Sequence, residues 1–245
     1  MEDERFMSDS SKEKELTPKQ LAHLAQTIQN AMKCHHSGDL KQAEKLYNEV
    51  LKLDETNSNA LHMLGILFIQ KEDYAKAVDY ITQAVAIEKE EPVYYSNLGV
   101  AYWYLNQHEK AIEAYRRALL IEPNDAEVYN NLGNALRDLG ELDEAIDNFK
   151  HALTLHASDP AVLYNLGLTY SEKGQLEEAI NYYQQALGQN SQHIKANVNL
   201  GNIYKELGKL NEAIVYYQRA IKYAPNHADA HNNLGNVPHV TWDKV

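Results

Sequence analysis

The sequence predicts an all-α fold, an α-solenoid in which pairs of helices stack one behind another. The first indication is a column of glycines 34 residues apart: Gly65, Gly99, Gly133, Gly167, Gly201 and Gly235. Two alanine columns keep the same spacing, one beginning at Ala43 and the other at Ala84. The aromatic residues are biased as well, with 17 Tyr against 3 Phe and 2 Trp. A fixed period of this length is the signature of a repeat architecture.

The N-terminal segment comes before the repeats. Residues 1–16 are charged and rich in serine, so we expect an acidic, disordered N-terminus. Thr17 and Pro18 suit the N-cap and the first position of a helix, which we expect to run to about His36. This helix serves as the first helix of the array, and the solenoid as a whole covers 17–236.

Six repeats follow, each predicted to be a helix, a turn and a second helix. They cover 24–57, 58–91, 92–125, 126–159, 160–193 and 194–227. In 126–159 apolar residues recur at three- and four-residue steps, and Gly140 stands where the first helix must end. Pro123 and Pro225 are expected to end second helices.

The small residues inside the helices need a structural reason. A glycine in a helix costs about 1 kcal/mol relative to alanine, so the glycine column predicts that the two helices of a repeat approach closely. Large side chains are then expected to fill the spaces between repeats: Leu132, Leu166 and Leu200 in first helices, and Tyr115, Phe149, Tyr183 and Tyr217 in second helices.

A seventh repeat begins at 228–236 and does not continue. Pro238 stands where the other repeats carry a helical residue, and a proline there breaks the helix. We expect 237–245 to be a tail without repeat character. We expect either that the array is truncated or frame-shifted there, or that Trp242 and Val245 fold back over its exposed edge.

These columns carry a family resemblance. A unit of 34 residues with Leu-Gly, then Tyr or Phe, Ala, Tyr or Phe, Ala and finally Pro resembles the tetratricopeptide repeat. The resemblance covers about five-sixths of the chain. It implies a right-handed superhelix of helix pairs with a concave groove lined by the first helices.

Composition and charge exclude several classes of function. The formal net charge is −12 and the pI is near 5.3, which argues against nucleic-acid partners because these are bound largely through Lys and Arg. No apolar run approaches the roughly 20 residues of a membrane span, and the N-terminus lacks the apolar core of a secretory signal. Cys34 is the single cysteine and no Asn-x-Ser/Thr sequon occurs, which indicates a reducing, cytoplasmic location.

The candidate binding residues are mostly asparagines of the first helices. The sixth position of successive repeats holds Asn97, Asn131, Asn165, Asn199 and Asn233, and the ninth holds Asn134, Asn202 and Asn236. Asparagine is a mediocre helix former, but its amide can pair with both the N–H and the C=O of an extended peptide. The alternative is that these amides bridge neighbouring helices or face water. We also include Arg137 and Tyr164, which could add charge or stacking.

The asparagine column narrows the resemblance. It resembles the repeat region of O-linked N-acetylglucosaminyltransferases, in which asparagines of the concave face hold the backbone of the protein substrate. The stretches CHHSGDLKQAEKLYNEVLKLDETNSNALHMLGIL, YSNLGVAY and YNNLGNALRDLG are similar to the start of bacterial, SPINDLY-like members. In those proteins a glycosyltransferase domain follows the repeats, and no such domain follows them in this sequence.

Other chemistry is not predicted. Chaperone-binding tetratricopeptide proteins hold a terminal carboxylate with lysines, but the fifth positions here are not basic: Ile28, His62, Ser96, Asn130, Tyr164 and Val198. His227 and His231 lie four residues apart without an evident third ligand, so we expect no metal site. No catalytic or cofactor-binding motif is present.

We therefore predict a non-enzymatic scaffold that binds a peptide or helix of a partner protein in its concave groove. The alternative is the substrate-recognition arm of an O-linked N-acetylglucosaminyltransferase-like enzyme without its catalytic domain. The sequence does not determine the oligomeric state.

Overall fold

The computed structural model describes residues 16–237. Within that range the chain forms 13 helices: α1 Pro18–His36, α2 Leu40–Leu53, α3 Ser58–Gln70, α4 Tyr74–Ile87, α5 Pro92–Tyr104, α6 His108–Ile121, α7 Ala126–Asp138, α8 Leu142–Leu155, α9 Pro160–Glu172, α10 Leu176–Gln189, α11 Ile194–Glu206, α12 Leu210–Tyr223 and α13 Ala228–Gly235. The expectations for 1–15 and for 238–245, including Pro238, Trp242 and Val245, lie outside the described residues.

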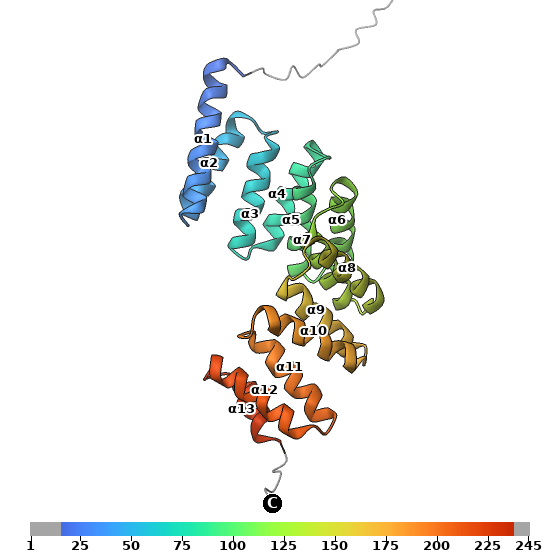
Figure 1. Ribbon diagram of the computed structural model, residues 1–245. Coiled ribbons are helices and arrows are strands. Elements are labelled where there is room, and N and C mark those ends of the chain that lie inside the picture. Colours follow the sequence, from blue (N-terminus) through green and yellow to red (C-terminus); the bar gives the residue numbers. More distant parts are fainter. Residues whose placement is uncertain (1–15, 238–245) are drawn as a thin grey trace, which may run out of the picture. The chain divides into compact units, whose positions relative to one another are not determined.

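The helices belong to two bodies, which are described separately. The N-terminal body, 16–89, contains α1 to α4, and the C-terminal body, 90–237, contains α5 to α13. Within each body the two helices of a repeat pack against each other, as α5 does with α6 and α7 with α8 (Figure 1). In the C-terminal body each second helix also packs against the next first helix. The predicted fold class, an all-α array of tetratricopeptide-type helix pairs, is confirmed.

The first helix begins where its sequence predicts. Thr17 is the N-cap of α1, and its hydroxyl accepts a hydrogen bond from the backbone N–H of Gln20. The side chain of Gln20 in turn accepts from the backbone N–H of Thr17 across 3.0 Å. This reciprocal capping box satisfies two backbone donors that the first helical turn leaves free.

The repeated glycines lie directly against rings of the second helices. A Cβ atom on Gly133 would stand 2.7 Å from Cε1 of Phe149, and one on Gly167 would stand 2.7 Å from Cδ1 of Tyr183. Glycine is therefore required because the ring occupies the space that a side chain would take. The large second-helix residues thus pack within their own repeat, and not only between repeats as the sequence suggested.

Each first helix ends in the same backbone conformation. Gly140 follows α7 with φ +85°, in the left-handed region that glycine adopts readily. The equivalent residue is also a glycine in three other repeats, but it is Glu72 after α3 and Asn106 after α5, with φ 59° and 56°. The turn therefore keeps the same backbone conformation in the two repeats that have a side chain at this position, although a side chain makes that conformation less favourable.

Candidate peptide-binding face

The predicted binding residues lie on the first helices and at the end of α13. Their positions are Asn97 on α5, Asn131, Asn134 and Arg137 on α7, Tyr164 and Asn165 on α9, Asn199 and Asn202 on α11, Asn233 on α13, and Asn236 as the C-cap of α13. Within the C-terminal body α7 contacts both α5 and α9, and α11 contacts α13. We call the surface that these residues form the first-helix face.

Two of the predicted asparagines are hydrogen-bonded to the preceding repeat. The amide of Asn165 donates to Oδ1 of Asn130 across 2.9 Å. The amide of Asn199 donates to the hydroxyls of Tyr183 at 3.0 Å and Tyr164 at 3.4 Å. These two amides bridge neighbouring helices, which is the alternative that the sequence left open.

Two more asparagines meet at the end of the array. Oδ1 of Asn202 accepts from the hydroxyl of Tyr217 at 2.9 Å and from the amide of Asn233 at 3.0 Å. Both bonds use the side-chain oxygen of Asn202, so its amide nitrogen takes part in neither. Asn97 is half-buried on α5, and Asn236 is exposed.

Asn131 and Asn134 differ from the others. Both are half-buried, and among the described residues no hydrogen bond reaches either side chain. They line a cavity of about 260 Å³ between α5 and α7 together with Glu127 and four apolar or aromatic residues: Val100, Trp103, Tyr104 and Tyr115. We call this cavity the Trp103 pocket.

The indole of Trp103 is held in place by a hydrogen bond to the next first helix. Nε1 of Trp103 donates to Oδ2 of Asp138 across 2.8 Å, which joins α5 to α7. The ring of Tyr104 stands nearly perpendicular to the indole, with centroids 5.0 Å apart. Sequence reasoning missed Trp103 and Tyr104 because it followed only the asparagine columns. Both could have been found, since they occupy the positions of Arg137 and Asp138 one repeat earlier.

Arg137 lies between two carboxylates. Its Nη2 donates to Asp138 at 3.3 Å, and its Nε is 4.0 Å from Glu172 of α9. Its Nη1 is buried without a hydrogen-bond partner among the described residues. Burial raises the pKa of Glu172, while the nearby Arg137 guanidinium opposes that change and Asp138 adds to it. Arg137 therefore balances local negative charge and is not a free cation.

Tyr164 is also engaged within the fold. Its ring stacks on His193 with centroids 4.6 Å apart, and both line a shallow hollow with Asn165 and Lys195. Burial is the main cause that raises the pKa of the Tyr164 hydroxyl. His193 therefore covers one face of the Tyr164 ring.

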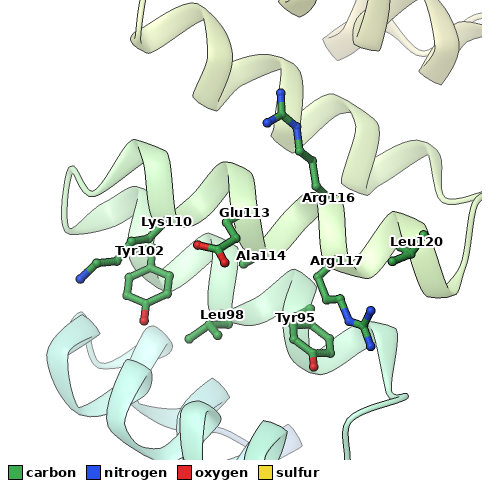
Figure 2. A pocket seen from close by; sticks show the side chains of 9 residues that line it. All are labelled: Tyr95, Leu98, Tyr102, Lys110, Glu113, Ala114, Arg116, Arg117 and Leu120. Atoms are coloured by element: carbon green, nitrogen blue, oxygen red, sulfur yellow. The ribbon is translucent and has the colours of Figure 1, made fainter.

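A larger hollow of about 620 Å³ lies on a different surface of the C-terminal body. Figure 2 shows its lining, in which Tyr95, Leu98 and Tyr102 come from α5 and the remainder from α6. Arg117 lies over the ring of Tyr95, 5.7 Å from its centroid, and Lys110 lies 5.3 Å from that of Tyr102. One repeat later the equivalent residues Leu132 and Leu136 belong to the packed core, and Tyr129 packs against it. This surface is therefore of the kind that packs between repeats.

His227 and His231, which the sequence singled out as possible metal ligands, both contact backbone groups. Nδ1 of His227 accepts from the backbone N–H of Ala230 and caps α13, while His231 contacts the carbonyl oxygen of Pro225 at 2.8 Å. Over residues 16–237 no group of three His, Cys, Asp or Glu side chains is arranged to hold a metal ion.

The helix pairs and the glycine–ring contacts define a tetratricopeptide repeat protein. The chain belongs to the family described as the cilia and flagella-associated protein 70 C-terminal domain, whose model matches residues 9–233. Such repeat domains generally serve as scaffolds for protein interactions. No curated protein matches the chain.

Several solved structures are similar. MamA is 27% identical with a TM-score of 0.63, over 67% of this chain and 96% of that one. PilW, a type IV pilus biogenesis factor, is 21% identical with a TM-score of 0.78, over 86% and 98%. YrrB, a tetratricopeptide protein with an unusual peptide-binding site, is 18% identical with a TM-score of 0.62, over 76% and 96%. The likeness to PilW and YrrB shows the fold.

The comparisons show no link to the O-linked N-acetylglucosaminyltransferases that the sequence resembles. Within the described part of the chain, none of the helices has the length and apolar character needed to cross a bilayer.

Proposed function

We propose that the protein is a non-enzymatic scaffold that binds a segment of a partner protein along the first-helix face of its C-terminal body. One observation carries this proposal: Asn131 and Asn134 line the Trp103 pocket, and their amides have no partner within the described protein. Neither amide is among the fully buried polar groups, so both remain open to water or to a ligand. The internally bonded Asn165 and Asn199 hold the adjacent helices in register instead.

Recognition would use the backbone of the bound segment. An amide side chain offers one acceptor and two donors, so it can pair with both the N–H and the C=O of an extended chain. Asn131 and Asn134 lie one helical turn apart, which is about 5 Å, and an extended chain rises about 3.3 Å per residue. The pair therefore suits contact with two successive residues of the segment. Because a flexible peptide must be ordered, we expect modest affinity.

The test begins with identification of a binding segment by pull-down with the full chain and mass spectrometry. Its dissociation constant is then measured by calorimetry for the double variant Asn131→Ala, Asn134→Ala. Two lost hydrogen bonds of about 1 kcal/mol each predict roughly tenfold to thirtyfold weaker binding. Asn181→Ala is the matched control, because Asn181 is an exposed helical asparagine of α10. Equal affinity of the double variant and the wild type would reject the proposal.

The remaining parts of the proposal concern the partner and the location. We propose a protein or peptide partner, with no nucleic acid, membrane, cofactor or chaperone carboxylate involved. The net negative charge of the chain supports the exclusion of nucleic acid. The half-buried, unpaired thiol of Cys34 supports a cytoplasmic location.

The column of asparagines also favours a second candidate. In it the repeats are the substrate-recognition arm of an O-linked N-acetylglucosaminyltransferase-like enzyme, and the bound segment is the substrate. This candidate predicts that the captured partners are acceptors of N-acetylglucosamine on Ser or Thr. Partners that lack the modification in mass spectrometry of the intact proteins would argue against it.

A further inference from the structure

We propose that the Trp103 pocket receives the side chain of a lysine or arginine from the bound segment. This inference rests on the proposed function and names the chemistry of the partner at one position. It is carried by the aromatic walls of the pocket, by its charge and by the amide acceptors in its lining.

The walls of the pocket suit a cation. Trp103, Tyr104 and Tyr115 come from α5 and α6, and the perpendicular rings of Trp103 and Tyr104 present an indole and a phenol to one space. Ring faces attract ammonium and guanidinium groups, and tryptophan does so most strongly. The bond from Trp103 to Asp138 fixes the indole before any ligand enters, so little ordering is needed on binding.

The charge of the pocket is negative. Its lining contains the carboxylate of Glu127 and no Lys, Arg or His. Glu127 is exposed at the rim of the pocket, and within the described part of the chain no ion pair engages it. The cation of the same helix, Arg137, is placed between the carboxylates of Asp138 and Glu172. These three groups together carry one negative charge, so Arg137 does not neutralise Glu127.

The carboxylate of Glu127 acts on the interior of the pocket. Burial is the main cause that raises the pKa of the Tyr115 hydroxyl, and electrostatic interactions with Tyr104 and with the carboxylate of Glu127 raise it further. Only the contribution of Glu127 favours a cation at this place, because burial opposes a charge of either sign.

An aliphatic side chain suits this pocket less well. It could cover the rings, but it would displace water from Glu127, Asn131 and Asn134 without replacing the hydrogen bonds. A lysine or arginine covers the rings with its methylene stem and donates to these acceptors with its polar end. An acidic side chain would meet Glu127 with like charge.

The test uses the full chain and small probes. The chain has two tryptophans, Trp103 and Trp242, so its indole N–H region contains two NMR signals, and Trp103→Phe assigns them. The Nα-acetyl N-methylamides of lysine, arginine, norleucine and glutamate are titrated against the wild type. We expect the lysine and arginine probes to shift the Trp103 signal saturably, with affinities at least about threefold above that of norleucine.

Variants identify the contributing groups. Glu127→Gln should weaken the lysine probe about fivefold, because it removes one nearby charge. Tyr104→Leu should weaken it about threefold, whereas Tyr104→Phe should retain it because the ring face remains. Glu177→Gln is the matched control, since Glu177 is likewise a glutamate in the first turn of a helix.

Equal binding of norleucine and lysine, or an unchanged Glu127→Gln variant, would overturn the inference. This outcome is distinct from failure of the proposed function. If the Asn131 and Asn134 variant loses the partner segment but the cationic probes do not bind the wild type, only the present inference fails. If the probes bind and the double variant retains the segment, the binding proposal fails instead.

Discussion

Gly133 of α7 lies directly against the ring of Phe149 of α8, so closely that a Cβ atom would stand 2.7 Å from Cε1. The same contact joins first and second helices in the neighbouring repeats. The close approach of the two helices therefore depends on a hydrogen atom at this position.

We predict that Gly133→Ala destabilises the protein although alanine is the better helix former. Overpacking against a buried ring costs about 1 to 3 kcal/mol, and the gain in helix propensity returns about 1 kcal/mol. Gly188→Ala is the control, because Gly188 lies in α10 and a Cβ atom added there would meet no side chain or neighbouring helix within 4 Å. Denaturation monitored by circular dichroism should show opposite signs for the two substitutions, and equal signs would contradict the packing argument.

Asn199 and Asn131 occupy the same position of two different repeats, but we predict different effects on stability. Asn199→Ala leaves the hydroxyl of the fully buried Tyr183 without its amide donor, which costs about 1 to 3 kcal/mol. Asn131→Ala breaks no internal bond and should change the free energy of unfolding by less than about 0.5 kcal/mol. Urea denaturation of both variants checks this, and Tyr183→Phe should remove most of the cost in the Asn199→Ala background.

His62 makes the N-terminal body sensitive to acid. Burial lowers the pKa of His62 to about 4. The unfolded chain, with a pKa near 6.5, binds a proton first as the pH falls, so stability declines from pH 6.5 towards 4. Each pH unit in that window corresponds to about 1.4 kcal/mol.

The variant His62→Val isolates this effect, because Val198 fills the equivalent buried position in another repeat. We expect the difference in unfolding free energy between wild type and variant to vary with pH only below about 6.5. A difference that is constant from about pH 7 to about pH 5 would show that His62 does not titrate in this range.

Glu72 keeps a backbone conformation that glycine adopts in most repeats. Its φ of 59° lies in the left-handed region, which costs a residue with a Cβ atom about 1 to 2 kcal/mol. Glu72→Gly removes this cost, but part of the gain in stability is offset because a glycine gives the unfolded chain more conformational entropy. We therefore expect a net stabilisation of up to about 1 kcal/mol in thermal denaturation, and a loss from the reverse change Gly174→Glu.

Much of the fold follows from the sequence for a physical reason. The glycine column marks the helix contacts and the turn glycines mark the helix ends, because both features depend on the absence of a side chain. Thr17 and Pro18 likewise predict the start of α1 from local sequence alone. These properties are set within one repeat, so they can be recognised in a linear pattern.

The column of asparagines does not predict which of their amides are hydrogen-bonded within the protein. Asn165 and Asn199 find partners at the fifth position of the preceding repeat, namely Asn130 and Tyr164. For Asn131 that position holds the short side chain of Ser96, and no bond forms between them. Whether an amide is free thus depends on a residue in another repeat, and the asparagine column alone does not contain that information.

Four polar contacts between consecutive first helices share one spacing: Trp103 with Asp138, Arg137 with Glu172, Asn130 with Asn165, and Tyr164 with Asn199 are each 35 residues apart. The bond between Asn202 and Asn233 departs from this spacing. The glycine–ring contacts, by contrast, never leave their own repeat. A chain with its repeats in permuted order would therefore keep every helix pair intact while exchanging the polar partners along the face. The order of the repeats therefore determines which polar side chains of the first helices are paired within the protein and which are not.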